Sequence, residues 1–297
     1  MLKASYFYLI FINFIINLMT YKFKKTFQLI ILFINVSFSI LSGQENQTEE
    51  EIKSLNEDEI AFKHSEWLEY RLHYGIFNAS YVSLSLNKEK LNGTDIFHAR
   101  GYGKSTGLLR FFFKVEDIYE SYFNINKTQP LRFIRNIDEG GYTKNTIIDF
   151  DINKKTAFVN DIKNNQKSNH KIEKNTQDLI STFYYLRNYF SRDKVKINES
   201  LDVNIFFDKE NYKFNLKFLG VEILNTKFGQ IECLKFLPVV QQGRVFREEE
   251  SVTLWVSNDL NKIPIRIEAD ILIGSIKCDL ENFKNLKHPF KIKIPNK

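Results

Sequence analysis

The stretch ASYVSLSL, residues 79–86, alternates apolar and polar side chains along its length. Val82, Leu84 and Leu86 fall on one face of an extended chain, and the hydroxyl-bearing residues between them fall on the other. A period of two is typical of an antiparallel strand with one face on a core and one face in water. This stretch therefore predicts β-sheet rather than helix.

The same alternation recurs along most of the chain. KFNLKFL (213–219) and IRIEADILI (265–273) repeat it, and turn pairs such as Asn92-Gly93 separate one run from the next. Asn-Gly is favoured in tight hairpins because both residues accept the backbone conformation that such turns need. We expect these strands to form two blocks, at about 67–161 and about 200–285.

Between the blocks, TQDLISTFYYLRNYF (176–190) predicts the one long helix. Asn175 or Thr176 can cap it, and Asp178 in its first turn suits the positive end of the helix dipole. The side chains at the helical period form a wide apolar arc with a narrow polar edge at Ser181 and Asn188. The arc consists of Leu179, Phe183, Leu186 and Phe190, flanked by Tyr184, Tyr185 and Tyr189.

An arc this wide fits a concavity better than a flat surface. We therefore expect a mainly β fold of antiparallel curved sheets, half-barrel-like and built from two blocks, with one central α-helix, in a single domain at 64–289. Phe183, Tyr184 and Arg187 are the predicted rim of an apolar pocket. A buried guanidinium needs a carboxylate, and Asp117 is the predicted partner of Arg187 in a structural ion pair.

The first 43 residues read as a leader. From Met19, basic residues are followed by an apolar run and then by small residues at Ser42 and Gly43, which predicts a signal peptide at 19–43. Residues 1–18 hold a second apolar run, so either translation starts at Met19, or Met1 is the start and both runs form an uncleaved anchor. We expect cleavage near Gly43, a periplasmic or secreted product, and membrane contact only through the leader. Residues 44–63 read as a polar tether.

The net charge and the cysteine content limit the classes of function further. The leader carries four lysines and no acid, so the net charge of +6 falls to +6 − 4 = +2 on cleavage. Nucleic-acid binding needs a cluster of basic residues on the surface, so we do not expect this protein to bind nucleic acid. Cys233 and Cys278 lie at apolar positions of expected strands. They can form a disulfide in an exported protein, or remain as two buried free thiols.

Motifs for catalysis or cofactors are not found. GYGKSTG (101–107) has His98 where a phosphate-binding loop needs its first glycine, so we expect a turn between strands instead. The polar segment IKNNQKSNHKIEKN (162–175) reads as a loop. The five histidines are dispersed, and no GxSxG sequence occurs. We therefore predict no catalytic residue, no cofactor and no metal, and a protein that is not an enzyme.

An ordered set of segments resembles the exported proteins of domain-of-unknown-function family 3108. The resemblance runs from about Trp67 to Leu280 and implies a periplasmic or secreted, mainly antiparallel β protein without an established activity. It marks Asp117, Tyr184, Arg187 and Trp255 as family features. The segments are WLEYRLHYGIFNASYVSLSL, FKVEDIYESYF, TQDLISTFYYLRNYF, GQIECLKFLPVV and VTLWVSNDLNKIPIRIEADILIGSIKCDL.

Three functions are compatible with these observations. The first is an exported, non-enzymatic binding or envelope-associated protein whose apolar concavity takes a lipid or other apolar ligand, or meets an envelope protein. The alternative is a structural or interaction module whose concave face is filled by its own helix and holds no ligand. The third is an unrecognised hydrolase.

Overall fold

The structure is a computed structural model that describes residues 52–191, 195–241, 252–270 and 274–293. The described residues belong to one compact unit, Leu41–Lys297. The expected signal peptide at 19–43, the preceding residues 1–18 and the start of the tether lie outside the described residues.

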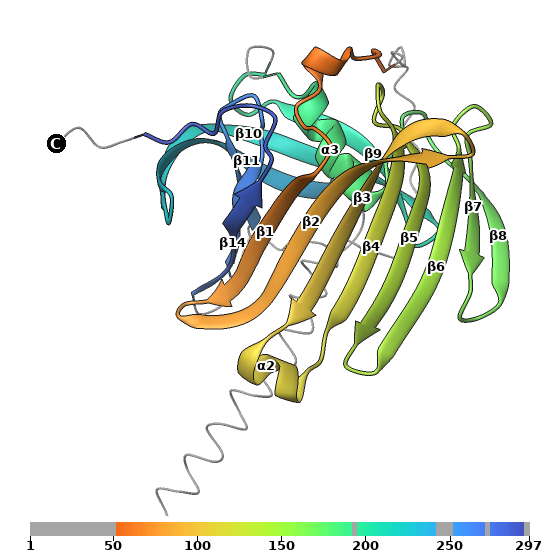
Figure 1. Ribbon diagram of the computed structural model, residues 1–297, viewed down its shortest axis with the longest axis horizontal. Coiled ribbons are helices and arrows are strands. Elements are labelled where there is room, and N and C mark those ends of the chain that lie inside the picture. Colours follow the sequence, from red (N-terminus) through yellow and green to blue (C-terminus); the bar gives the residue numbers. More distant parts are fainter. Residues whose placement is uncertain (1–51, 192–194, 242–251, 271–273, 294–297) are drawn as a thin grey trace, which may run out of the picture. The chain divides into compact units, whose positions relative to one another are not determined.

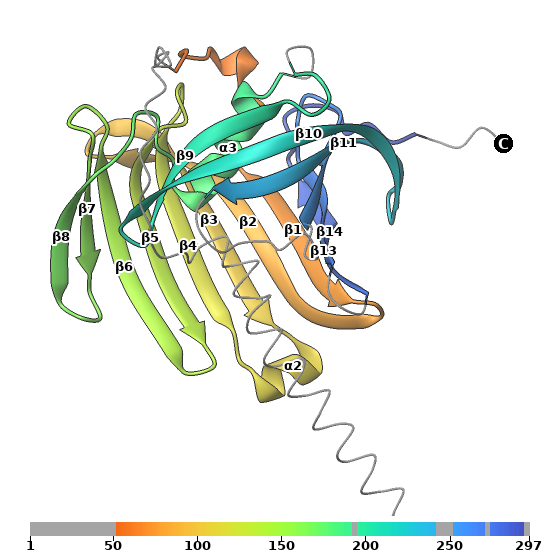
Figure 2. The same ribbon diagram turned by 180° about the vertical axis from the view of Figure 1, so that it is seen from behind.

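Fourteen strands in the described part of the chain form one sheet (Figures 1 and 2). The first run consists of β1 (Glu66–Tyr74), β2 (Phe77–Leu91), β3 (Thr94–Ser105), β4 (Glu116–Asn124), β5 (Pro130–Glu139), β6 (Tyr142–Asp151), β7 (Thr156–Asp161) and β8 (Gln166–Lys171). The second run consists of β9 (Ser200–Phe207), β10 (Glu210–Thr226), β11 (Gly229–Gln241), β12 (Val252–Ser257), β13 (Pro264–Asp270) and β14 (Ser275–Lys284). The helical segments are η1 (Glu57–Glu59), α2 (Gly107–Phe112) and α3 (Leu179–Tyr189).

The sheet is a meander that is joined where its first strand meets its last. Its strand order is β8-β7-β6-β5-β4-β3-β2-β1-β14-β13-β12-β11-β10-β9, and every neighbouring pair is antiparallel. Strands β8 and β9 are its edges, so the curved sheet remains open. The expected fold class, mainly antiparallel β with one central helix, is confirmed.

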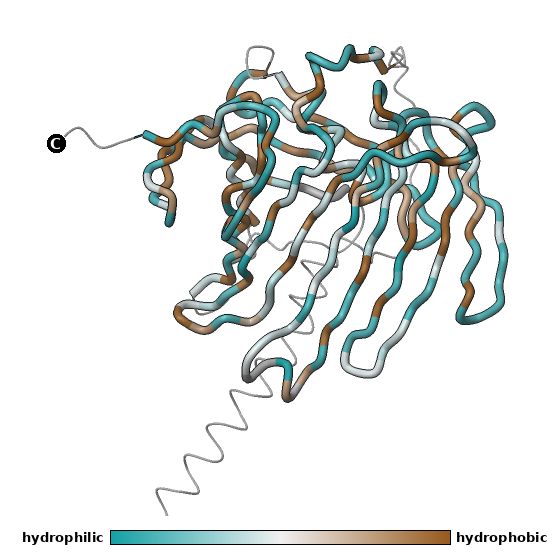
Figure 3. The backbone as a smooth tube through the Cα atoms, in the orientation of Figure 1, coloured by the Kyte–Doolittle hydropathy of each residue, from teal (hydrophilic) through white to brown (hydrophobic). Residues whose placement is uncertain are grey.

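Because consecutive strands of the first run alternate in direction, their connections gather at two ends. The connections β1–β2, β3–β4, β5–β6 and β7–β8 lie at one end, which is the lower end in Figure 1. Along β2, Leu84 and Leu86 are buried while Ser83 and Ser85 remain half-exposed, as the alternation predicts. Figure 3 shows this alternation of apolar and polar residues along the strands.

Helix α3 lies on the concave side of the sheet and packs against both runs of strands. On one side, the Tyr184 ring lies 4.7 Å from Phe62 and 5.3 Å from Phe123. At its end, the Phe190 ring lies 5.2 Å from Phe236 and 6.3 Å from Phe218. Aromatic rings bury large apolar areas, so the helix ties the first run to the second.

Two local expectations differ from the structure. The tether is not uniformly polar and solvated, because Ile52, Leu55 and Phe62 are buried. The polar segment at 162–175 is not a loop throughout, because Gln166–Lys171 forms the edge strand β8. Its mixed polar sequence lacks the apolar alternation by which strands are recognised, since most of its side chains meet solvent.

The helix also differs in its ends and in its buried face. It begins at Leu179 with Asp178 as N-cap, not with Asn175 or Thr176. Ser181, expected on the polar edge, is fully buried, whereas Leu179, Phe183 and Leu186 are only half-buried. The innermost face of α3 is therefore partly polar, and its predicted apolar arc is divided between core and surface.

Candidate functional site

The first turn of α3 is fixed by a buried carboxylate. Asp178 accepts hydrogen bonds from the backbone N–H groups of Ile180 at 2.8 Å and Ser181 at 2.7 Å. Its second oxygen accepts from the Ser121 hydroxyl of β4 at 2.6 Å. Burial raises the pKa of Asp178 to about 6, although these hydrogen bonds oppose the shift. The helix start is thus locked to the middle of β4.

The last turn of α3 is held by an ion pair with β1. Arg187 donates to both carboxylate oxygens of Glu66, at 2.6 and 2.8 Å, and the residues are 2% and 1% exposed. Its Nε also donates to the Asn261 carbonyl at 2.8 Å. Burial alone lowers the pKa of Arg187, but the Glu66 carboxylate outweighs burial and raises it. The predicted Asp117–Arg187 pair is therefore wrong, because Glu66 holds the guanidinium and Asp117 faces other groups.

Glu66 was missed because it stands just before the first strand-like alternation and reads as a surface residue. The only available signal is its position one residue before Trp67, at the start of β1.

The three predicted rim residues do not share one environment. Phe183 and Arg187 line a small apolar cavity of about 60 Å³ under α3, together with Leu186, Phe190 and residues of β10–β13. Tyr184 points away from this cavity into the aromatic core and is 1% exposed. Ligand pockets usually have volumes of about 300–1,000 Å³, so this cavity has no room for an acyl chain. A ligand-binding role for Phe183, Tyr184 and Arg187 stays a prediction.

A larger hollow of about 560 Å³ lies beyond the end of α3, near the β12–β13 turn. Of the charged groups on its wall, Lys53, Glu59 and Lys291 are exposed and Asp259 and Lys262 are half-buried, and Lys53 and Glu59 pair with each other at 2.6 Å. Exposed ion pairs of this kind add little energy. The hollow therefore lacks the convergent buried polar groups that mark a specific site.

Such groups do converge on the concave face between the N-terminus of α3 and the lower end of the sheet. Along β4, the residues that face α3 are Phe123 and Ser121, and the same parity continues downward through Tyr119 to Asp117. Neighbouring strands and the β9–β10 turn add further charged residues. We call the set the inner polar cluster: Asp117, Tyr119, Arg135, Glu139, Lys144, Thr146 and Asp208.

Asp117 and Glu139 form an acid pair within this cluster. Asp117 is 3% exposed, and one of its oxygens accepts from the backbone N–H of Asp138 at 3.1 Å. Burial, reinforced by a hydrogen bond with the Glu139 carboxyl, raises the pKa of Asp117 to about 8. Two carboxyl groups so close cannot both ionise easily, so the pair holds a proton at neutral pH.

Opposite charges from across the concavity balance the rest of the cluster. Asp208, in the β9–β10 turn, accepts a hydrogen bond from Arg135 at 2.5 Å and another from Lys144. The Arg135 guanidinium lies 4.0 Å above the Phe207 ring. Burial, followed by the nearby Arg135 charge, lowers the pKa of Lys144. This turn therefore fixes Arg135 from the far side of the concave face.

Several buried atoms of the cluster have no hydrogen-bond partner within the described residues. Five of the nine such side-chain atoms belong to Asp117, Tyr119, Arg135, Glu139 and Thr146. The shared proton accounts for one oxygen each of Asp117 and Glu139. The remaining three are the Tyr119 hydroxyl, Arg135 Nε and the Thr146 hydroxyl, which belong to residues in one register row across β4, β5 and β6. The side chains of Tyr119 and Arg135 also lie within hydrogen-bond reach of each other. Because buried polar groups are normally satisfied, the row keeps unused hydrogen-bonding capacity that water or a ligand can take up.

Two glycines of the neighbouring strand lie beside this row, and Ile180 of α3 fills the space at Gly101, 3.4 Å from where a Cβ would lie. Gly101 and Gly103 of β3 lie opposite Tyr119 and Asp117 in the register. A Cβ at Gly103 would meet only Val82, at 3.8 Å. A glycine inside a strand often marks a close approach by another group. GYGKSTG thus supplies the end of β3 and the first residue of α2, rather than a turn alone.

Other expected features can be placed as well. Cys233 and Cys278 are free and buried, and burial raises the pKa of both thiols to about 12. Among the described residues, no three His, Cys, Asp or Glu side chains are arranged to hold a metal. Trp255 is buried and donates to Glu222 at 3.1 Å.

Within the described ranges, the helices are too short or too polar to cross a bilayer.

The fold defines the class of protein: an open, barrel-like antiparallel sheet that wraps a single long helix. The chain belongs to the family described as "Protein of unknown function (DUF3108)", whose model matches residues 69–281. No curated protein matches the sequence.

Among solved structures, the chain is similar to a beta-barrel-like protein of domain of unknown function DUF1849 from Brucella abortus, with a TM-score of 0.51 and 8% identity. That match covers 76% of this chain and 99% of the other, and it concerns the fold alone. A "putative lipoprotein" from Parabacteroides distasonis matches with a TM-score of 0.31 and 11% identity over 76% of this chain and 98% of that one. A TM-score that low supports no structural argument.

Proposed function

We propose that this protein is an exported, non-catalytic binding protein of the cell envelope, and that its ligand lies on the concave face below α3. The leader sequence supports export. The observation that supports the binding site is the row of buried polar groups with unused hydrogen-bonding capacity among the described residues, on Tyr119, Arg135 and Thr146.

The composition of this face suits an amphipathic ligand. A polar ligand group can accept a hydrogen bond from Arg135 Nε and exchange hydrogen bonds with the hydroxyls of Tyr119 and Thr146. Val82 and Gly103 lie beside these groups, are half-exposed and offer apolar surface. The small cavity beside Phe183 is not the site of the proposal, because it cannot hold an acyl chain.

The test is native mass spectrometry of the protein isolated from its own cells, with Tyr119→Phe and Tyr122→Phe as a matched pair. Both changes remove one phenol hydroxyl from β4, but Tyr122 lies on the outer face, stacked on His98 at 4.2 Å. We expect a co-purifying mass in the parent and in Tyr122→Phe, and a reduced fraction in Tyr119→Phe. An apo mass for a folded parent protein contradicts the proposal and favours the interaction module.

A second candidate, a hydrolase, has one observation in its favour. The Asp117–Glu139 pair holds a proton near neutral pH, as a general acid must. Turnover of any ester, amide or glycoside in a broad panel, abolished by Asp117→Asn in a variant that still folds, would establish this alternative. Absence of turnover leaves the pair as a part of the binding face.

A further inference from the structure

Large apolar side chains are unusually exposed at the lower end of the sheet. Ile76 is 88% exposed and Phe111 is 83% exposed, which are the two highest values among the exposed large apolar residues of the described chain. Phe77, Tyr142 and Ile162 are also exposed. We call these five residues the lower rim.

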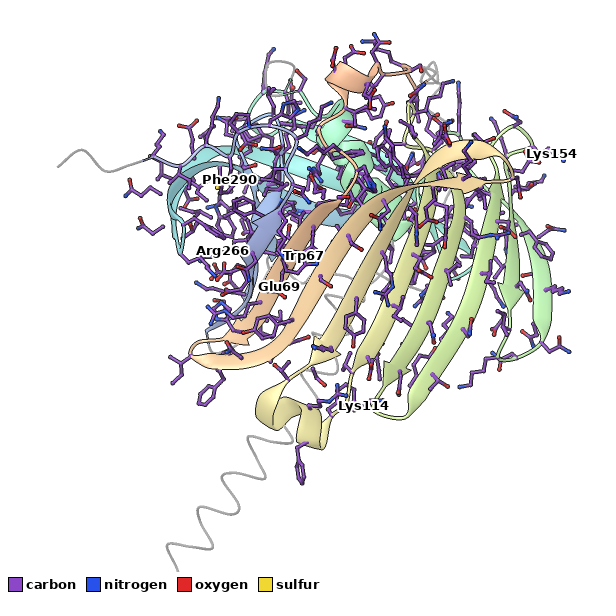
Figure 4. The ribbon with its side chains drawn as sticks, in the orientation of Figure 1. Trp67, Glu69, Lys114, Lys154, Arg266 and Phe290 are labelled. Carbon is purple, nitrogen blue, oxygen red and sulfur yellow. The ribbon has the colours of Figure 1, made fainter. Side chains whose placement is uncertain are left out.

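The lower rim is not a chance scatter of surface residues. Its members come from four separate connections: β1–β2, β3–β4, β5–β6 and β7–β8. Isolated exposed apolar residues are normal, but five of the eleven exposed large apolar residues of the described chain lie at this one end, which favours an interaction surface. The opposite end of the same strands shows the contrast, because its exposed turn residues are polar, such as Asn92, Asn126 and Lys154. Lys154 is labelled in Figure 4.

Hydrogen bonds hold the connections of the rim in place. The backbone N–H of Gly140 donates to the Lys114 carbonyl at 2.8 Å, which ties the β3–β4 connection to the β5–β6 hairpin. Thr106 N–H donates to the Ala79 carbonyl at 3.0 Å, and Lys163 Nζ donates to the Thr143 carbonyl at 2.8 Å. The exposed apolar side chains therefore lie on connections that hydrogen bonds hold to one another.

Cations accompany the apolar tips. Lys104, Arg110, Lys114 and Lys163 are exposed at this end, and Lys163 lies 5.9 Å above the Tyr142 ring. The carboxylates at the same four connections are less exposed. Asp161 is buried, Glu139 belongs to the inner polar cluster, and Glu116 and Asp138 are half-exposed and bond Arg110 and Lys114. The exposed Lys104 and Lys163 therefore supply the excess positive charge at this end. Figure 4 shows Lys114 at the foot of β4. The end is therefore apolar at its tips and positive around them.

We propose that the lower rim docks on the surface of an anionic lipid bilayer. Aromatic and aliphatic side chains enter the interfacial region, while Lys and Arg meet anionic headgroups. The rim consists of separate tips rather than one continuous patch. Fluid lipid can fill the space between such tips, whereas a protein partner needs a continuous complementary surface. This inference does not depend on the proposed function, because it involves other residues.

A local probe gives the first test. Both native cysteines are buried, so an environment-sensitive dye on Ile76→Cys reports the rim alone, and Leu260→Cys provides a matched exposed site away from it. Vesicles of phosphatidylcholine and phosphatidylglycerol in equal amounts should shift the emission at position 76 to the blue and leave position 260 unchanged. No shift at 76, or the same shift at both sites, overturns the proposal. A shift at 76 that follows protein concentration without vesicles shows a second copy on the rim and also overturns it.

Co-sedimentation of the full chain with the same vesicles gives the second test. Residues 1–51 are identical in every variant, so a difference between variants reports the rim. We expect the double change Ile76→Ser/Phe77→Ser to weaken partitioning by at least about tenfold, and Leu260→Ser to leave it unchanged. Binding should also fall in high salt and on pure phosphatidylcholine. Equal partitioning of the rim variant and the parent refutes the inference.

Discussion

The buried Glu66–Arg187 pair offers the sharpest test of how α3 is held in the sheet. We consider three variants: Glu66→Leu, Arg187→Met and the two changes together. Each replaces a charged side chain with an apolar one of roughly similar volume. The pair is suited to this experiment because both residues are almost completely buried and joined by two short hydrogen bonds.

The expected magnitudes follow from what each variant leaves behind. Removing one partner leaves the other charge buried and unpaired, which costs about 3–5 kcal/mol of unfolding free energy. The double variant leaves no charge, but the Asn261 carbonyl loses the hydrogen bond from Arg187 Nε. An unsatisfied buried carbonyl costs about 1–3 kcal/mol. We therefore expect the double variant to be more stable than either single variant.

The assay is urea unfolding followed by tryptophan fluorescence, with all variants measured in one buffer. The exposed pair Lys154–Asp151, which is separated by 3.0 Å, serves as control, and Lys154→Met should change stability by less than about 0.5 kcal/mol. If the losses of the two single variants simply add in the double variant, the pair contributes no coupling and the reasoning fails. A loss below about 1 kcal/mol for Arg187→Met has the same consequence.

Three further predictions concern other parts of the fold. The pKa of Asp117 is raised to about 8 in the folded protein, so its contribution to stability is fully present below the unfolded value near 3.8 and is lost as the pH rises through 8. Thermal melts should show a fall in Tm from pH 6 to pH 9 that is smaller in Asp117→Asn than in the parent. An equal fall in both proteins contradicts the raised pKa of Asp117. Asp178→Ala should lower the unfolding free energy by about 2 kcal/mol in urea titrations, because two backbone N–H groups and Ser121 lose their acceptor; Asp178→Asn, which keeps an acceptor oxygen, should lose less, and equal losses would exclude the capping role. Phe62→Ala should lower the unfolding free energy by about 3–5 kcal/mol in the same measurement, because the ring is buried against Tyr184. Lys63→Ala, next to it, should leave the unfolding free energy unchanged. If Phe62→Ala also leaves it unchanged, the segment behaves as the solvated tether that the sequence predicts.

The sequence predicted the sheet well because strands with one buried face show a regular alternation of apolar and polar residues. Leu84 and Leu86 alternate with half-exposed serines, and each such run reads as a strand without further context. The edge strand β8 lacks this alternation because both of its faces are largely solvated. Phe62 was hidden for the opposite reason, since a single buried ring in an acidic stretch forms no pattern.

The candidate site could be predicted only in part. Arg187 was correctly expected to need a buried carboxylate, but pairing across the sheet decides which one, and Glu66 lies more than a hundred positions away. The inner polar cluster left a weaker signal. Arg135 and Asp117 occupy positions that face the core, where a charged residue is unexpected. Their convergence depends on the register between strands, and the alternation within one strand does not show which residue of the next strand lies opposite.

The pairing of β1 with β14 has a consequence for how the protein is made. A chain that is synthesised from its N-terminus completes the first eight strands while the outer side of β1 still lacks its neighbour. Until the residues of β14 emerge, that side presents open backbone donors and acceptors, which invite pairing with other chains. A product truncated before Ser275 would keep this exposed border permanently. Quality control should therefore act most strongly on chains that lack their last few dozen residues.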